Sequence, residues 1–146
     1  MDKLDFKIVN MLKKNGRLSN ANVARVLNVS EGTIRRRLKK MTNENIIRIF
    51  AVPNPESIGL HSEALIGIQV DPDKMEIIAN KVSELDQATW VAHTTGTFDI
   101  FLWAAVESTE ELGKFIRSSV GTIPGVRRTE TFVNLKVVKR GNGPRD

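Results

Sequence analysis

Apolar residues recur at helical spacing in three short groups along the first third of the chain. The groups are Leu4, Ile8, Met11 and Leu12, then Val23, Ala24 and Leu27, then Ile34, Leu38 and Met41. This spacing predicts three amphipathic helices. Ser19 and Ser30 precede the second and third groups as N-caps, and Asn15-Gly16 predicts a left-handed C-cap for the first helix. About three residues separate the second helix from the third, which is typical of a helix-turn-helix.

The rhythm changes after this segment. Residues 46–52 are predicted to form a strand, and Pro53-Asn54-Pro55 ends it and marks a domain boundary. Alternating or continuous apolar runs then predict strands over 64–70, 89–95, 99–106 and 126–138. Helices are predicted to begin at Pro72 and after the capping residue Ser108. The order strand-helix-strand-strand-helix-strand is the split βαβ, ferredoxin-like arrangement.

The predicted fold class is therefore α+β, with a winged-type helix-turn-helix followed by a ferredoxin-like βαββαβ domain. The expected boundaries are 1–47 for the helix-turn-helix, 48–61 for a strand and linker, 62–139 for the ferredoxin-like domain and 140–146 for a tail.

Composition excludes several classes of function. The chain has no cysteine and only two isolated histidines, so disulfides and thiolate metal sites are excluded and a zinc cluster is disfavoured. It has no apolar run of about 18 residues to span a membrane. We therefore expect a cytoplasmic protein without cofactor, metal or membrane partner.

Charge is unevenly placed along the 146 residues, whose net charge is +5. Residues 1–52 hold 12 Lys and Arg against four Asp and Glu, whereas residues 53–146 hold 10 against 13. A basic half beside a mildly acidic half indicates that the first meets a polyanion. The alternative is a well-solvated surface with a chance asymmetry.

The third predicted helix has an apolar face and a basic face. With Ile34 central to the inner face, Arg36, Lys39 and Lys40 fall opposite it, and Arg37 lies nearer the core edge. No acidic residue interrupts the run from Arg35 to Lys40, which disfavours a plain solvated surface because like charges four residues apart destabilise a helix. Such a helix fits the major groove of DNA. The candidate DNA-binding residues are Ser19, Ser30, Gly32, Thr33, Arg35, Arg36, Arg37, Lys39 and Lys40.

RNA is a weaker candidate partner, because the second half lacks the aromatic motif of a base-stacking sheet. An enzyme is also disfavoured, since no nucleophile–base pair, phosphate loop or metal cluster is visible.

Several motifs, in order along nearly the whole chain, resemble the leucine-responsive regulatory protein/AsnC family. They include Asn15-Gly16-Arg17-Leu18-Ser19-Asn20, Thr95-Gly96-Thr97-Phe98-Asp99 and Ile123-Pro124-Gly125-Val126. Arg37 falls on that family's recurrent recognition-helix arginine. Asn28 and Asn45 stand where glycine is common, and both suit left-handed positions. His93 replaces a usually apolar residue.

The resemblance implies a homo-oligomer, a dimer or an octameric ring, which joins through the second domain and binds an amino acid between protomers. Backbone N–H groups at Gly96 suit a carboxylate, and Asp99 suits an α-ammonium group. Alternatively, Gly96 is only a hairpin glycine and Asp99 only caps a turn. The candidate effector-binding residues are Thr95, Gly96, Thr97, Phe98, Asp99, Ser108, Thr109, Thr131 and Val133, and the resemblance implies that the last two come from the facing subunit.

The sequence thus predicts a sequence-specific transcription regulator that binds double-stranded DNA. A small-molecule effector, expected to be an amino acid, would modulate its assembly or its promoter occupancy. The alternative is an effector-independent architectural DNA-binding protein.

Overall fold

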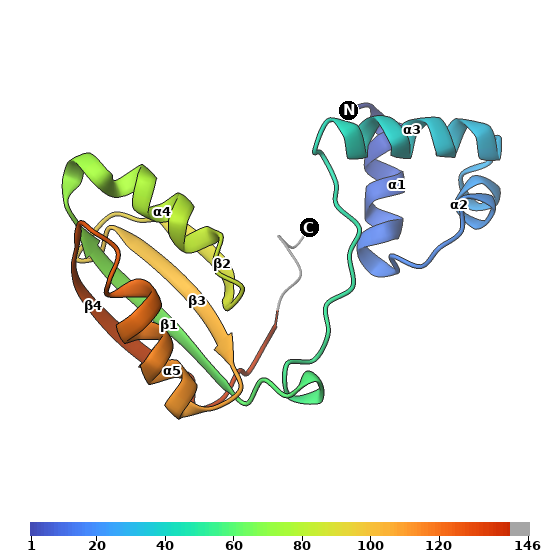
Figure 1. Cartoon of the computed structure of the whole chain (residues 1–146). Coiled ribbons are helices and arrows are strands. Elements are labelled where there is room, and N and C mark those ends of the chain that lie inside the picture. The colour runs from blue at the N-terminus through green and yellow to red at the C-terminus, as the bar shows by residue number, and fades with distance from the viewer. Residues whose placement is uncertain (141–146) are drawn as a thin grey trace. The chain divides into compact units, whose positions relative to one another are not determined.

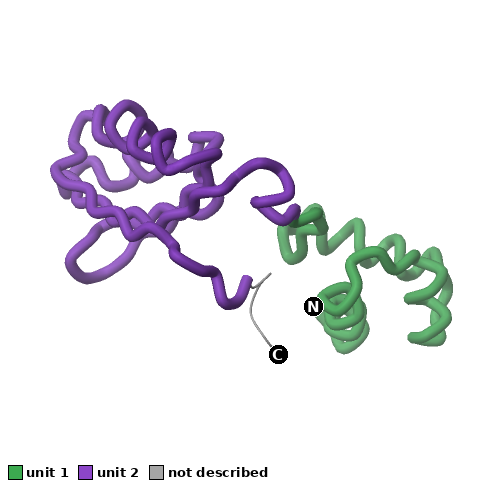
Figure 2. Tube along the Cα trace, turned by 90° about the horizontal axis from the view of Figure 1, so that it is seen from below, with its two compact units in different colours: residues 1–52 green, residues 53–146 purple. Residues whose placement is uncertain are grey.

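The computed structural model describes residues 1–140 and divides the chain into two compact units (Figures 1 and 2). The first unit is Met1–Val52 and the second is Pro53–Asp146. Of the predicted tail at 140–146, all but Arg140 lies outside the described residues.

Three helices form the first unit. They are α1 (Lys3–Lys14), α2 (Asn20–Leu27) and α3 (Glu31–Asn43). Their apolar stripes meet in one core, made of Ile8, Val23, Ala24, Ile34 and Met41. This confirms the three predicted helices and the three-residue turn between α2 and α3.

The ends of these helices follow local side-chain chemistry. Ser19 Oγ accepts a hydrogen bond from the Asn22 N–H at 3.2 Å, and Asn28 ends α2 with a left-handed backbone, φ 54°. The predicted left-handed end of α1 is wrong, because Asn15 is extended and Gly16 has no positive φ. Asn15 Oδ1 instead accepts from the Arg17 N–H at 3.0 Å, and this side-chain turn redirects the chain without a left-handed residue.

The strand predicted over residues 46–52 is also wrong. The segment is irregular and exposed, with Phe50 69% accessible. Its alternating apolar residues have no neighbouring strand to pair with among the described residues, and an isolated strand leaves its backbone groups unpaired.

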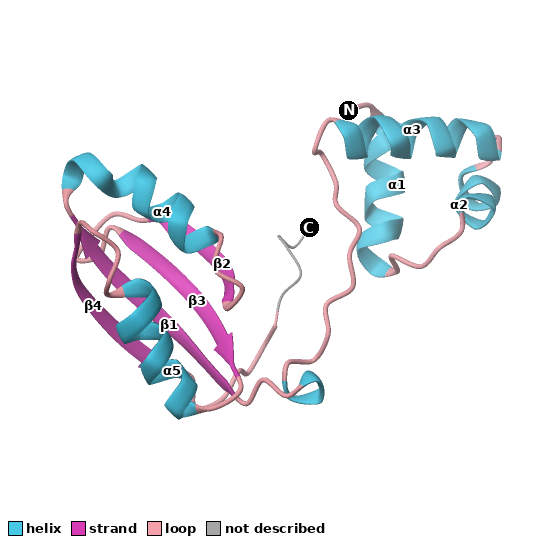
Figure 3. Ribbon diagram, viewed as in Figure 1, coloured by secondary structure: helices cyan, strands magenta, loops and turns pink. Residues whose placement is uncertain are grey.

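A four-stranded antiparallel sheet with two covering helices forms the second unit (Figure 3). Its strands are β1 (Ser62–Val70), β2 (Ala88–His93), β3 (Ile100–Val106) and β4 (Val126–Val133), in the order β2-β3-β1-β4. Helices α4 (Met75–Ser83) and α5 (Thr109–Phe115) cover one face, where Ile66, Ile78, Leu102 and Phe115 share a core. This confirms the predicted ferredoxin-like fold.

Three short helical turns complete this unit. A 3-10 turn, Glu56–Ile58, precedes β1, and another, Pro72–Lys74, leads into α4 with proline in its first turn. The helix predicted after Ser108 is α5 followed by a π-helical segment, Ile116–Val120.

The last strand is shorter than the predicted 126–138. Its final register pair with β1 is Ala64 with Val133, and the Asn134 N–H still donates to the Glu63 carbonyl at 2.8 Å. β1 begins at Ser62, so the later residues have no strand beside them. Farther along, the Arg140 guanidinium contacts the Glu63 carboxylate at 2.6 and 2.9 Å.

The other face of the sheet carries aromatic side chains that no helix in the described part of this unit covers. Phe98 packs there between Phe101 and Phe132, with ring centroids 5.5 and 6.4 Å away. The Phe98 ring occupies the space above Gly67, where an added Cβ would lie 2.6 Å from its nearest carbon. Gly67 is therefore the residue that allows Phe98 to lie flat on β1.

We predict that Gly67→Ala destabilises the second unit by about 1–3 kcal/mol, because the added methyl group displaces a well-packed ring. Unfolding followed by tryptophan fluorescence measures this unit, since Trp90 and Trp103 both lie in it. Gly113→Ala is the matched control, because its new Cβ meets only the movable end of Arg117. Equal stability of the two variants would contradict the prediction.

Candidate DNA-binding and ligand-binding sites

The third helix presents a basic surface and buries an apolar one, as the sequence predicts. Ile34 and Met41 are fully buried, whereas Arg36, Lys39 and Lys40 are exposed. Ser30 begins the helix: its Oγ accepts from the Thr33 N–H at 3.1 Å and lies 2.9 Å from Thr33 Oγ1.

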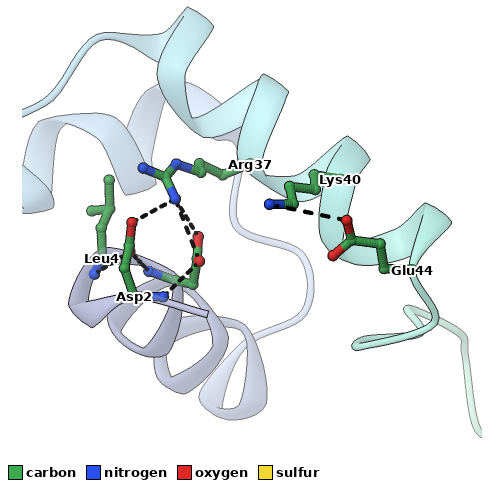
Figure 4. A network of polar contacts seen from close by, with 6 residues as sticks. Asp2, Leu4, Arg37, Lys40 and Glu44 are labelled. Atoms are coloured by element: carbon green, nitrogen blue, oxygen red, sulfur yellow. Dashed lines mark hydrogen bonds and ion pairs between the residues drawn. The ribbon is translucent and has the colours of Figure 1, made fainter.

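The basic run has carboxylate partners that the sequence analysis overlooked. Arg35 contacts Glu31 at 2.8 Å, and Lys40 Nζ lies 4.0 Å from Glu44 (Figure 4). These partners stand one helical turn before and after the run, so the absence of acidic residues inside it was a misleading observation. Exposed pairs of this kind contribute only about 0.2–1 kcal/mol, and a phosphate can displace them.

Arg37 is held more firmly than its neighbours. Its Nη1 lies 2.6 Å from Asp2 Oδ2 and 3.3 Å from Asp5 Oδ1, and both carboxylates belong to the start of α1. Figure 4 shows Arg37 reaching from α3 toward Asp2. Arg37 thus joins the first and third helices of the unit.

The two aspartates also form a capping box at the start of α1. Asp2 Oδ1 accepts from the N–H groups of Leu4 and Asp5, and Asp5 Oδ2 accepts from the Asp2 N–H at 2.9 Å. The hydrogen bond from the Asp5 backbone, followed by that from Arg37, holds the pKa of Asp2 below its usual value. The Asp2 carboxylate correspondingly raises the pKa of Arg37.

Within residues 1–140, Arg36 and Lys39 are the cations of the run that make no ion pair. Gly32 is exposed near the start of α3, where an added Cβ would meet no atom closer than 3.9 Å. Ser19 lies at the start of α2 and caps that helix. The candidate DNA-binding residues therefore divide into free cations, paired cations, the groups that form the helix caps and the exposed Gly32.

The loop between β2 and β3 carries the predicted effector residues from Thr95 to Asp99. Gly96 has a left-handed φ of 109°, as its turn requires. Asp99 binds the end of β1: its Oδ2 accepts from the Val70 N–H at 2.9 Å, and its own N–H donates to the Ile68 carbonyl. Gln69 Nε2 donates to the Thr97 carbonyl at 2.7 Å. The loop is therefore anchored on β1.

A hollow of about 540 Å³ lies beside this loop. Thr97 and Asp99 line it together with Gln69, Arg127 and Arg128. The sequence analysis missed the last three, although the Arg-Arg pair directly after the predicted Pro-Gly-Val turn was a visible signal. Two guanidinium groups opposite one carboxylate suit a ligand with a carboxylate and an amine.

The remaining predicted effector residues lie elsewhere in the second unit. β3 separates Ser108 and Thr109 from the loop, and its seven residues span roughly 23 Å at about 3.3 Å per residue. Thr131 and Val133 lie on β4, opposite Ile66 and Ala64. None of these four residues lines the hollow.

A second hollow, of about 480 Å³, lies at the Ser108 end of the sheet. Its charged lining is mostly acidic, with Asp86, Glu107 and Glu111 against Lys114. This charge disfavours a ligand carboxylate, so the hollow beside Asp99 is the better candidate for an amino acid.

Residues 1–140 contain neither a metal-binding cluster nor a membrane-spanning helix. No group of three or more His, Cys, Asp or Glu side chains there is arranged to hold a metal ion. No helix in the same range is long and apolar enough to cross a membrane.

Family models match both units of the chain. Residues 1–48 match a winged helix-turn-helix DNA-binding domain, and residues 63–144 match the Lrp/AsnC ligand binding domain.

Relatives and solved structures agree with these matches. An HTH-type transcriptional regulator of Pyrococcus furiosus, itself described as uncharacterized, is 39% identical over 97% of this chain and 96% of its own length. Ptr1, an HTH-type transcriptional regulator of Methanocaldococcus jannaschii, is 34% identical over 97% of both chains. The structure of AsnC from E. coli has 28% identity and a TM-score of 0.83 over 97% of this chain and 96% of its own.

Fold, basic helix and family matches together define a helix-turn-helix transcription regulator with a ligand-binding domain, and not an enzyme. The chain belongs to the Lrp/AsnC family. This confirms the family indicated by the sequence motifs.

We predict that Asp2 stabilises the first unit above about pH 4, the ordinary aspartate pKa, and that this contribution is lost as pH falls through the lower native pKa. The free energy of unfolding of the first unit should therefore fall more between pH 5 and pH 3 in the wild type than in Asp2→Asn. Urea unfolding followed by circular dichroism measures it. Tryptophan fluorescence reports the second unit separately, and Asp73→Asn is the charge-matched control there. Equal losses in wild type and Asp2→Asn would count against this role.

Proposed function

We propose that the protein is a sequence-specific regulator that reads DNA with the exposed face of α3. The observation that carries this proposal is the pair of free cations, Arg36 and Lys39, on a helix whose opposite face is buried. An arginine near the middle of such a helix can contact guanine or phosphate, and a lysine suits phosphate. Arg35 and Lys40 each form an exposed ion pair with one carboxylate, unlike Arg37, which contacts two. They would exchange these carboxylates for phosphates.

We further propose that an amino acid or a related metabolite binds in the hollow beside Thr97 and Asp99. Both guanidinium groups are exposed. Arg127 Nε lies 4.0 Å from Asp71 and Arg128 Nη2 lies 3.0 Å from Glu130, so carboxylates already orient them. The carboxylate of the ligand would bind to these two arginines, and the ammonium group of the ligand would face Asp99. The structure of a Neisseria meningitidis regulator in complex with L-Met, 27% identical with a TM-score of 0.86 over 99% of this chain and 96% of its own, supports an amino acid as the class of ligand.

The uncovered sheet face supports a homo-oligomer as the working form. Trp90 is 53% exposed and Phe132 45% exposed on a face that no helix of the described chain covers. They lie on the two edge strands, β2 and β4, and exposed aromatic side chains on an uncovered face are typical of association surfaces. A dimer joined through this face would carry two helix-turn-helix units and read two half-sites. Assembly or promoter occupancy would then respond to the ligand.

For the DNA site, we predict that Arg36→Ala weakens binding to a duplex selected by the wild-type protein from a random library. A lost base contact costs about 1–3 kcal/mol, and a lost phosphate contact lowers the slope of log K against log salt by about 0.9. Titrations at several salt concentrations measure both, and Lys81→Ala in α4 is the control for one lost positive charge. Unchanged binding of Arg36→Ala would remove α3 as the reading surface. A wild-type preference of less than roughly 10³ over random duplex would favour the architectural alternative.

For the ligand site, we predict that one or more of the twenty amino acids raises the melting temperature of the wild type. A ligand at about 100 times its Kd adds roughly 2.7 kcal/mol. Arg128→Gln should lose most of this stabilisation, because the ligand carboxylate loses its partner. Arg117→Gln, outside the hollow, should retain it. A ligand that stabilises all three proteins equally would place its site elsewhere.

A further inference from the structure

The basic run of α3 contains one arginine whose surroundings differ from those of the others. The side chain of Arg37 is 29% exposed, compared with 70% for Arg35, and its partner Asp5 is only 9% exposed. Its partners lie 35 and 32 positions away along the chain, whereas those of Arg35 and Lys40 lie within one helical turn. Arg37 is therefore tied to another helix, and the other paired cations of the run are tied to their own.

We propose that Arg37 is a positioning residue for DNA recognition, which fixes the rotation of α3 by binding Asp2 and Asp5 and does not itself contact DNA. This inference rests on the proposed role of α3. It changes the reading of Arg37 from a contact residue to a support for the contact residues beside it.

Arg37 is held by two carboxylates at once. One nitrogen, Nη1, lies 2.6 Å from Asp2 and 3.3–3.4 Å from both oxygens of Asp5. To reach a phosphate, Arg37 would have to leave both. The two carboxylates would then remain together at the start of α1, with Asp5 buried and without its cation, and unpaired buried charge is strongly unfavourable.

The ion pair of Arg37 with Asp2 and Asp5 fixes the orientation of α3 against α1, which the apolar core does not. α1 and α3 also share a core through Ile8, Ile34 and Met41, but apolar packing is largely non-directional. A hydrogen-bonded ion pair fixes distance and angle together. Successive residues of a helix differ by about 100°, so fixing Arg37 also fixes the direction of the adjacent Arg36.

Removing the charge of Asp2 or Asp5 has opposite expected effects on DNA binding under this proposal and under electrostatic repulsion alone. Two carboxylates on a unit that binds a polyanion weaken its attraction to DNA. Removing one would therefore strengthen binding to any duplex if charge alone mattered. If the carboxylates act through Arg37, removing one weakens binding to the selected duplex.

The test measures affinity for the selected duplex and for random duplex across a range of salt concentrations, with four full-chain variants. They are Arg37→Lys, Arg37→Gln, Asp5→Asn and Arg36→Gln. Arg37→Lys keeps the positive charge, but its ammonium group ends one bond nearer the backbone than Nη1 and sits on a flexible stem, so it does not hold both carboxylates in the same geometry. Circular dichroism at the assay temperature selects the variants that are folded, and Arg37→Lys and Asp5→Asn suffice if Arg37→Gln is not.

The expected result is a loss of about tenfold in affinity for the selected duplex in Arg37→Lys and Asp5→Asn, the scale of coupling between contacting residues. Random-duplex affinity and its salt slope should be unchanged in Arg37→Lys, and affinity for random duplex should be unchanged or higher in Asp5→Asn. A fifth protein, the double variant that combines Arg37→Lys with Asp5→Asn, should lose little more than either single variant.

Two results would overturn the inference. Arg37→Lys could bind like the wild type while Arg37→Gln flattens the salt slope, which would make Arg37 a phosphate contact. Alternatively, Asp5→Asn could bind the selected duplex more tightly than the wild type does. The carboxylates would then affect binding only by repelling DNA, and not by positioning Arg37. Failure of the proposed function is distinguishable, because Arg36→Gln would then bind both duplexes as the wild type does.

Discussion

Repulsion between like charges along α3 is the constraint on which the DNA-binding unit depends. Five cations within six positions destabilise a short helix unless carboxylates lie near them. The fold supplies carboxylates from two directions, since Glu31 and Glu44 come from α3 itself and its end, and Asp2 and Asp5 come from α1. Three cations of the helix are therefore paired with carboxylates. Arg36 and Lys39, the residues proposed to read DNA, are the two that make no ion pair among the described residues.

The second unit is organised by β1, which is paired on both sides. One of its faces packs against α4 and α5, and the other supports Phe98 above Gly67. Its last residues hold the loop before β3 through Val70 and Asp99. A single strand therefore fixes the covered core, the uncovered aromatic face and the edge of the proposed ligand site.

The sequence predicted features that depend on local periodicity and capping. The buried face of α3, the left-handed Asn28 and the order of strands and helices along the second unit belong to this group. Two errors are local, namely the left-handed end expected at Asn15-Gly16 and the overlooked carboxylates of Glu31 and Glu44. The others concern contacts between distant segments. The supposed strand at 46–52 lacked a neighbour to pair with, and the partners of Arg37 stand more than thirty positions away. Arg127 and Arg128 were missed because three separate segments build the hollow that they line.

The loop from Thr94 to Asp99 links the two surfaces proposed for ligand binding and assembly. Thr97 and Asp99 line the hollow, whereas Phe98 between them packs against Phe132 on the uncovered face. Thr94 also donates a hydrogen bond from its Oγ1 to the Phe98 carbonyl at 2.7 Å, which ties the two ends of the loop to each other. A ligand that shifts Asp99 relative to Val70 would therefore shift Phe98 over Gly67. In the proposed regulator, this gives ligand binding a direct physical route to the association surface, because adjacent residues of one anchored loop serve both.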